Sequence, residues 1–334
     1  MVGKPGIPKN KSDLNRVVAQ TPAQSGPVTA VQVPGQSNLS TKLVYSLRLM
    51  KPITWFAPMW AFLCGAVATG MDWGDIQNIL RLLLGVGLAG PILCGLSQVL
   101  NDWFDREVDA INEPDRLIPS GKVSKNQVMT TIVGLTVLGV IIPVLLGAPV
   151  AILSALGFLL AITYSVHPIR AKRNGWIGNA LVAVSYEGLP WLAGSAAFGP
   201  NHTASWQAIS GLSLVAASLY SFGSHGIMTI NDFKSITGDL IMGIRTIPVQ
   251  YGPKTASWIA LTIMDVAQIA VAQVLFFDGK WFNAMLVLLF LLVQLPLQRR
   301  FVADPKGRAI WYNATGTTLY VYGMLVTAIA IGVR

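Results

Sequence analysis

The chain has 334 residues, of which 53% are hydrophobic and 12% are charged, and its mean hydropathy is +0.55. Soluble domains carry about 25% charged residues, so this composition excludes a soluble, disordered or collagen-like protein and indicates a membrane protein. The net charge of +9 is not accompanied by a basic, aromatic-rich soluble face, which argues against nucleic-acid binding. Both cysteines, Cys64 and Cys94, lie in apolar stretches and are too few for a disulfide framework or a metal cluster.

The N-terminal segment differs in composition from the rest of the chain. Residues 1–40 are rich in Gly, Pro, Ser and Gln and lack helical periodicity, so we expect a disordered cytoplasmic tail. In residues 41–52, Leu43, Leu47 and Met50 recur at helical spacing among basic residues, which predicts a helix in the membrane interface. Residues 41–334 are expected to form a single membrane domain.

Nine apolar tracts follow, each long enough to cross a hydrocarbon core of about 30 Å. The tracts are continuously apolar, whereas barrel strands alternate, and the sequence therefore predicts an all-α integral membrane fold with nine transmembrane helices. The tracts cover approximately residues 52–70, 82–100, 128–147, 149–166, 176–198, 207–230, 255–277, 282–297 and 309–333.

The basic residues predict the orientation of these helices. If the N-terminus is cytoplasmic, 21 of the 24 Lys and Arg residues fall on the inner side, and only Arg81, Lys280 and Arg334 fall outside. This bias follows the positive-inside rule, so we expect a multi-pass membrane protein with a cytoplasmic N-terminus.

A first acidic segment directly follows the second tract. Six of the 15 acidic residues lie between Asp102 and Asp115. Asn101, Asp105 and Asp109 are spaced i, i+4, i+8 and share one helix face, and Asp102 lies one turn before Asp105. Like charges at this spacing repel unless a cation neutralises them, and all-oxygen ligands suit Mg²⁺.

A second acidic segment ends the sixth tract and repeats the first. It contains Asn231, Asp232 and Asp239. The Asn-Asp pair at 101 recurs at 231, and the Arg-x-Ile-Pro pattern at 116 recurs at 245, an offset of 129 to 130 residues that covers four tracts. The repeat predicts two four-helix halves plus a ninth helix around a central cavity, with both acidic segments at its cytoplasmic mouth. The alternative is that both segments are solvated loops that cap helix ends.

Basic residues near the acidic segments are candidates for binding a diphosphate beside the metal. Arg116, Lys122, Lys234 and Arg245 lie within or next to the two segments. Arg170, Lys172 and Arg173 lie between the fourth and fifth tracts, where the positive-inside rule already explains their sign. Whether Lys172 or Arg173 also reaches the diphosphate is left open by the sequence.

Three polar residues lie apart from these segments. Glu187 and Asp265 are ionisable groups inside apolar tracts, where such groups are costly and usually have a role. Glu187 could either line a substrate cavity or make a structural hydrogen bond. For Asp265, which is remote from both acidic segments in the sequence, we expect a structural role. His225, two turns before Asp232, is either a metal-ligating imidazole or a hydrogen-bonding partner of a neighbouring helix.

The acidic segments resemble those of a known family. NDWFDREVD at 101–109 resembles the first Asp-rich motif of the UbiA-type intramembrane prenyltransferases, and residues 231–252 resemble the second. The resemblance covers residue 45 to the end. Within that family, EGLPW at 187–191, HGIMTINDFK at 225–234 and WYNATGTTLYVYGM at 311–324 resemble the chlorophyll and bacteriochlorophyll synthases, with the bacteriochlorophyll branch favoured.

The resemblance implies a Mg²⁺-dependent polyprenyl transfer. A geranylgeranyl or phytyl diphosphate would lose its diphosphate, and the propionate of a chlorophyllide or bacteriochlorophyllide would capture the allylic cation as an ester. Asp105, Asp109, Asp232 and Asp239 would be catalytic. Ser235 stands where many relatives have a second aspartate, which leaves the second-motif ligands undecided. The implied metal ligands are Asn101, Asp102, Asp105, Asp109, Asp232 and Asp239, and the implied diphosphate contacts are Arg116, Lys122, Lys172, Arg173, Lys234 and Arg245.

Other functions compete with this interpretation. Relatives that modify haem or a quinone precursor share the chemistry and differ only in the acceptor. A secondary transporter would place its acidic ligands near the membrane midplane, whereas these acids cluster at one end. A pigment-binding assembly protein would need His ligands in several tracts, and only His225 lies well inside one. For a pigment-modifying enzyme, we also expect pigment-protein assembly partners.

Overall fold

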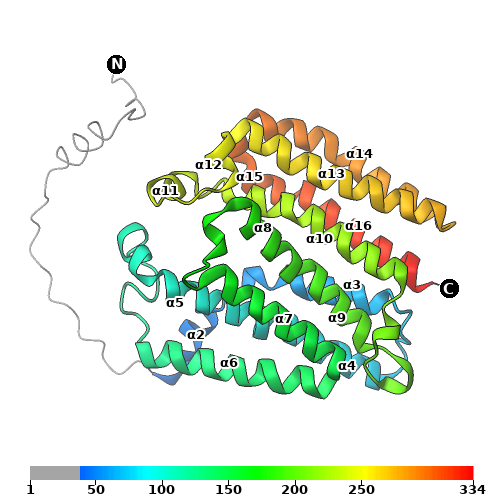
Figure 1. The fold of residues 1–334 in the computed structure, drawn as a ribbon, viewed down its shortest axis with the longest axis horizontal. Helices are drawn as coiled ribbons and strands as arrows, with labels where there is room; N and C mark the ends of the chain where they lie inside the picture. Colours follow the sequence, from blue (N-terminus) through cyan, green and yellow to red (C-terminus); the bar gives the residue numbers. More distant parts are fainter. Residues whose placement is uncertain (1–37, 334) are drawn as a thin grey trace, which may run out of the picture. The chain divides into compact units, whose positions relative to one another are not determined.

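The computed structural model describes residues 38–333, and every regular element of this region is a helix. The chain folds as a bundle of roughly aligned helices (Figure 1). The predicted N-terminal tail lies outside the described residues, apart from its last three positions. α2 (Leu39–Leu49) occupies the predicted interfacial segment and begins two residues before it.

The first acidic segment is carried by a long, interrupted helix. Asp75 begins α4 by accepting a hydrogen bond from the Gln77 backbone N–H. The helix widens into the π-helical segment η2 around Pro91 and continues as α5. Ser124 caps α6 in the same way, through the Gln127 N–H. The elements of this part are η1 (Pro52–Thr54), α3 (Phe56–Val67), α4 (Ile76–Gly87), η2 (Leu88–Cys94), α5 (Gly95–Asn112), α6 (Lys125–Leu146) and α7 (Ala148–Ser165).

The second acidic segment begins in the last turn of α10. A second π-helical turn, η4, interrupts the helix before it and contains Glu187. The elements of this part are η3 (Ala171–Arg173), α8 (Gly175–Ala183), η4 (Val184–Gly188), α9 (Leu189–Ala197), η5 (Pro200–His202), η6 (Trp206–Ala208), α10 (Gly211–Asp232), α11 (Ile236–Ile241), α12 (Ile247–Tyr251), α13 (Pro253–Phe277), α14 (Trp281–Ala303), α15 (Pro305–Ala314) and α16 (Gly316–Gly332).

Small residues bring the central helices close together. α3 packs along α9, and α10 packs along α13. A Cβ added to Gly65 of α3 would lie 1.9 Å from the Trp191 carbonyl oxygen, and one added to Gly194 of α9 would lie 2.1 Å from the Phe62 carbonyl oxygen. The two backbones therefore touch only because both positions are glycine, a packing mode common between helices in membranes.

The chain is an integral, multi-pass membrane protein. Within residues 38–333, six helices are long and apolar enough to cross a bilayer. α3 is apolar but shorter, with 12 residues, and the fifth and sixth predicted tracts correspond to α8–η4–α9 and α10. The six are Ile76–Glu107, Lys125–Leu146, Ala148–Ser165, Pro253–Phe277, Trp281–Ala303 and Pro305–Gly332.

Candidate active site

The first acidic segment forms the last turns of α5, as its spacing predicts. Asp102 and Asp109 are 8% and 6% exposed, and Asp105 is partly buried. Each of these carboxylates is matched by a cation of the chain. An unpaired carboxylate is costly in free energy when buried, and pairing with a cation offsets this cost for each of the three acids.

Asp105 is paired with the α7–α8 loop, residues 166–174. Arg170 donates to its Oδ1 at 2.6 Å, and Lys172 donates to its Oδ2. The same Lys172 ammonium donates to Asn101 Oδ1 at 2.8 Å, which also accepts a bond from the Ser165 hydroxyl at 3.3 Å. Lys172 therefore contacts two of the predicted metal ligands at once.

Asp102 and Asp109 are paired with a different set of cations. The Lys51 ammonium lies 2.6 Å from Asp102 Oδ1, and Arg116 Nη1 lies 3.7 Å from the same atom. Arg116 also donates to Asp109 Oδ2 at 2.9 Å and to both oxygens of Glu113. Arg116 thus lies against the acidic face of α5, as predicted from its position in the segment.

The second acidic segment holds its carboxylates with neutral donors. Asn179 of α8 donates to Asp232 Oδ2 at 3.0 Å. Asp239 Oδ2 accepts hydrogen bonds from Ser235 at 2.7 Å and from Thr246 at 3.4 Å. The Ser235 hydroxyl therefore donates directly to the Asp239 carboxylate.

The α7–α8 loop connects the two segments. The Arg245 backbone N–H donates to the Arg173 carbonyl at 2.9 Å, and the Gly175 N–H donates to the Arg245 carbonyl at 2.8 Å. A Cβ on Gly175 would lie 2.6 Å from the Ile247 nitrogen, so only glycine allows this approach. The loop thus contacts the first segment through side chains and the second through backbone bonds. The α7–α8 loop thereby connects two acidic segments that are separated by more than one hundred residues in the sequence.

Burial works against the charged forms in this region. It raises the pKa of Asp109, although Arg116 opposes the shift. It likewise raises the pKa of Asp239. The pKa of Lys172 is lowered by burial, against the effect of Asp105. A region that destabilises its own anions in this way favours an added cation.

The donor chemistry fits a hard divalent cation. Among the described residues, His, Cys, Asp and Glu side chains do not form a group of three or more in a metal-binding arrangement. The donors of the two segments are all oxygens, and the second segment has no Lys or Arg side chain bound to its carboxylates among the described ion pairs. This all-oxygen, partly desolvated set is of the type that binds Mg²⁺.

Four of the predicted diphosphate contacts have exposed side chains. Lys122, Arg173, Lys234 and Arg245 are all solvent-accessible. Lys122 reaches only the Asp115 carbonyl, at 3.4 Å, whereas Lys234 acts electrostatically on Asp232. Lys172 and Arg116 are the two predicted basic residues whose side chains bind carboxylates of the acidic segments.

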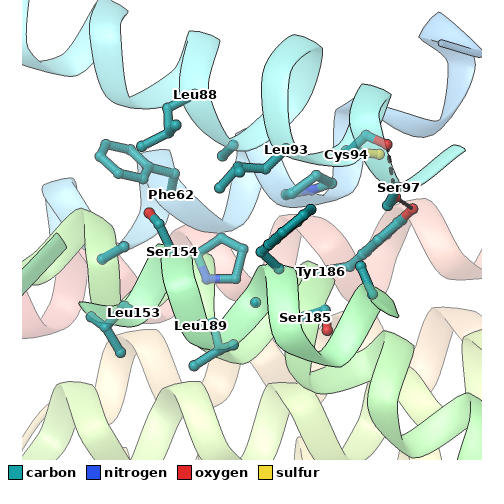
Figure 2. A pocket seen from close by; sticks show the side chains of 17 residues that line it. Phe62, Leu88, Leu93, Cys94, Ser97, Leu153, Ser154, Ser185, Tyr186 and Leu189 are labelled. Carbon is teal, nitrogen blue, oxygen red and sulfur yellow. Dashed lines mark hydrogen bonds between the residues drawn. The ribbon is translucent and has the colours of Figure 1, made fainter. Parts of the chain in front are cut away.

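A mostly apolar channel lies inside the bundle next to the first segment. It is enclosed by α3, η2, the start of α5, α7 and the η4–α9 helix. The channel is narrow, with a cavity volume of about 60 Å³. Figure 2 shows Cys94, Ser97 and Tyr186 at one end and Phe62, Leu88 and Leu153 toward the other.

Comparison with known proteins assigns the chain to a family. Residues 58–319 match the model of the UbiA prenyltransferase family. The chain belongs to the UbiA prenyltransferase family. It is a polyprenyl transferase, and the predicted resemblance is confirmed.

Relatives within the UbiA family refine this assignment. The chain is 56% identical over 290 residues to the bacteriochlorophyll synthase 34 kDa chain of Chloroflexus aurantiacus, which covers 86% of this chain and 90% of the relative. It is 40% identical over 292 residues to the chloroplastic chlorophyll synthase of Oryza sativa subsp. japonica, covering 85% of this chain and 76% of the relative. A solved UbiA homolog from Archaeoglobus fulgidus, bound to GPP and Mg²⁺, has a TM-score of 0.58 at 14% identity, covering 86% and 99% of the two chains.

The isolated polar residues of this UbiA-family chain lie outside the acidic site. Glu187 is 5% exposed, and its Oε2 has no hydrogen-bond partner among the residues that the structure describes. His225 bonds through Nε2 to the Trp176 carbonyl at 3.1 Å and lines a groove of about 390 Å³ between α8–η4–α9 and α10. Asp265 accepts a bond from Gln298 of α14 at 2.7 Å, in agreement with a structural role.

Three contacts of the acidic residues were not predicted from the sequence. Lys51 binds Asp102, Arg170 binds Asp105, and Asn179 binds Asp232. Lys51 and Arg170 both have a positive φ, of 48° and 40°. Such backbone is uncommon for residues other than glycine and marks positions that the surrounding structure holds in place. In the sequence, Lys51 and Arg170 are basic residues near helix ends, and the positive-inside rule already accounts for such residues without any contact to the acidic segments.

Proposed function

We propose that this UbiA-family enzyme esterifies the propionate of bacteriochlorophyllide, or of the related chlorophyllide, with geranylgeranyl or phytyl diphosphate. The observation that carries the proposal is the 56% identity to the Chloroflexus aurantiacus bacteriochlorophyll synthase chain over 90% of its length. The paired acidic segments and the adjacent channel supply the chemistry that such a reaction needs.

The acidic segments would hold Mg²⁺ and, through it, the diphosphate. The proposed ligands are Asn101, Asp102, Asp105, Asp109, Asp232 and Asp239. When bound, Mg²⁺ would neutralise the negative charge that develops on the leaving diphosphate. The proposed diphosphate contacts of the chain are Arg116, Lys122, Lys172, Arg173, Lys234 and Arg245.

Lys172 is the residue best placed to contact the diphosphate. Its ammonium already binds Asn101 and Asp105, so it lies among the proposed ligands. Arg170 lies beside it, and its buried Nε has no hydrogen-bond partner within the described part of the chain. Fixed cationic donors of this kind stabilise a departing anion more strongly in a water-poor site than in water.

The ester forms by exchange of one carbon–oxygen bond for another. The bond between C1 of the prenyl chain and the diphosphate oxygen breaks, and its electron pair leaves with the diphosphate. A propionate oxygen of the acceptor then donates an electron pair to C1. The apolar channel excludes water, which would otherwise capture the allylic cation and give a prenyl alcohol.

The acceptor is proposed to approach from the side of α8 and α10. His225 and Glu187 remain our candidates for contacts with the pigment. His225 lines a groove formed largely by small residues of these two helices, and it lies two turns before Asp232 on α10. A flat macrocycle fits a groove with small side chains better than a compact acceptor would.

The proposed topology has nine transmembrane helices, in two four-helix halves plus a ninth around a central cavity, with a cytoplasmic N-terminus. The repeat of the acidic segments at the ends of α5 and α10 supports the two halves. Together with the six longer spans, α3, α8–α9 and α10 would make up the nine transmembrane helices. Residues 41–334 would then form a single domain in the cytoplasmic or photosynthetic membrane, with pigment-protein assembly partners.

Acceptor screening tests the proposal against its alternatives. Purified protein is incubated with geranylgeranyl diphosphate and, in separate reactions, with bacteriochlorophyllide, chlorophyllide, haem or a quinone precursor, and products are identified by mass. We expect prenyl esters of the two chlorophyllides. Prenylated haem or quinone precursor, without pigment esters, would overturn the proposal in favour of those relatives.

A further inference from the structure

The channel runs from the acidic site towards the opposite side of the membrane. Along η2 and α5 its lining extends from Ser97 back to Leu88, and along α7 it extends from Ala161 back to Leu153. Both helices lead towards the acidic end of the bundle in chain order, so Ser97 and Ala161 mark the near end of the channel and Leu88 and Leu153 the far end. Figure 2 shows Ser97 at one end and Leu88 and Leu153 toward the other.

The near end lies about one helical turn from the proposed metal site. Ser97 lies four residues before Asn101 on α5, and Ala161 lies four residues before Ser165 on α7. Residues four apart on a helix share a face. The Ser165 hydroxyl donates to Asn101 Oδ1, so the two lining faces converge on the same amide oxygen. A diphosphate held at Asn101 would therefore have its carbon chain directed into the channel.

The far end is closed by a packed floor. Phe62, Leu88 and Leu153 are 1%, 2% and 7% exposed and belong to one buried cluster. The Phe62 ring lies against α4, where a Cβ on Gly85 would be only 1.9 Å from Cζ of the ring. The ring thus fits into space that Gly85 leaves, and buried Leu82, Val150 and Ala66 belong to the same cluster.

The distance from the proposed metal site to the floor matches the length of one class of prenyl chain. Thirteen residues separate Asn101 from Leu88, which corresponds to about 20 Å along a helix. An extended chain advances about 3.5 Å per three bonds, so the sixteen-carbon backbone of a C20 prenyl group spans about 18 Å. A C25 chain would be about 5 Å longer and would meet the floor.

We propose that Phe62, supported by Leu88 and Leu153, is the floor that limits the polyprenyl donor to about twenty carbons. The proposal rests on the proposed function only in requiring a polyprenyl diphosphate donor, and it is independent of the acceptor. Phe62 is a specificity-determining residue because its side chain meets the end of the chain, far from the reacting carbon.

Two variants with opposite effects test the floor. Phe62→Ala removes the ring and lengthens the channel, and Phe62→Leu is a milder version for use if the first does not fold. Gly157→Leu places a large side chain across the channel, because even a Cβ there would lie 3.7 Å from Leu189 on the facing wall. Phe301→Ala is the matched control, because Phe301 is equally buried but belongs to a different cluster.

Turnover is measured as kcat/KM for all-trans C10, C15, C20 and C25 diphosphates. We expect a Phe62 variant to raise the C25 to C20 ratio at least about tenfold, and Gly157→Leu to raise the C10 to C20 ratio by a similar factor. The control should leave both ratios unchanged. If a Phe62 variant that retains C20 turnover keeps the wild-type C25 to C20 ratio, Phe62 is not the floor.

Donor binding without acceptor separates this proposal from the proposed function. Thermal stabilisation by unreactive thiolodiphosphates of the same four lengths is measured for wild type and variants in detergent. We expect wild type to be stabilised most by the C20 compound and the Phe62 variant to be stabilised equally or better by C25. Equal stabilisation of wild type by C20 and C25 would overturn the floor alone, whereas no stabilisation by any donor would contradict the proposed function as well.

Discussion

Lys172 of the α7–α8 loop donates to Asn101 of α5 at 2.8 Å, across 71 residues of sequence. The next residue of the loop, Arg173, accepts a backbone bond from Arg245 in the second acidic segment. Two consecutive residues therefore contact both acidic segments. This connection makes the loop part of the candidate active site and links the two acidic segments directly.

Replacing the carboxylates of α5 should abolish turnover. Asp105→Asn and Asp109→Asn keep size but remove charge, and each is expected to lower kcat/KM at limiting Mg²⁺ by at least about 100-fold. Glu107→Gln is the control, because Glu107 lies on the same helix but has an 84% exposed side chain. Near wild-type turnover in both aspartate variants would show that the metal is held elsewhere.

The second segment should distinguish Asp239 from Ser235. Asp239→Asn is expected to cripple the enzyme, because a carboxylate at a proposed metal site is lost. Ser235→Ala removes one hydrogen bond to Asp239 and should slow turnover by no more than about tenfold. Single-turnover rates across a Mg²⁺ titration measure both effects. Equal losses in the two variants would place the second-segment ligand at Ser235.

Lys172→Ala should weaken stabilisation of the departing diphosphate. Removing one charged donor from such a site typically costs about 100-fold or more in kcat. We expect this loss in kcat/KM for the donor, with the KM for the acceptor unchanged. Lys125→Ala, an exposed lysine at the start of α6, is the control. If the Lys172→Ala enzyme were as active as the control, the basic residues of the loop would serve only to orient the helices in the membrane.

Gly175→Ala tests the connection between the loop and the second segment. The added Cβ would lie 2.6 Å from the Ile247 nitrogen and 2.8 Å from Thr246 Cα, so the two backbones must separate. Overpacking of this kind costs about 1–3 kcal/mol, and we expect a lower Tm together with reduced turnover. Gly134→Ala on α6, where the added atom meets nothing within 4 Å, should change neither quantity. A wild-type Tm in Gly175→Ala would mean that the connection is not under close steric constraint.

Cysteine labelling tests the proposed orientation. Ser120 is exposed in the loop that follows α5, and both native cysteines are buried. A cysteine introduced as Ser120→Cys is expected to react with an impermeant maleimide only when the cytoplasmic face is accessible. Reaction from the periplasmic side alone would invert the proposed topology.

The sequence predicted the local features of this site well. Hydropathy marked the helical tracts, and the i, i+4, i+8 spacing placed Asn101, Asp105 and Asp109 on one face of α5. The family assignment also followed from the acidic motifs and is confirmed by the match over residues 58–319. Each of these features depends on residues within a few helical turns of one another.

The long-range contacts were not predictable in the same way. Lys51 and Arg170 reach Asp102 and Asp105 only because the loops fold back over α5, and a basic residue at a helix end has the same sequence pattern whether or not it does so. The π-helical segments η2 and η4 also have no hydropathy signature. The floor at Phe62 depends on its fit against Gly85, 23 positions later in the sequence.

The most direct test of the proposed reaction counts both of its products. Purified protein is incubated with geranylgeranyl diphosphate and bacteriochlorophyllide, with Mg²⁺ or with a chelator, and released diphosphate and pigment ester are quantified in the same reaction. We predict equal amounts of the two products with Mg²⁺ and neither with the chelator. Diphosphate release without ester, or ester formation that persists after complete removal of divalent metal, would contradict this mechanism.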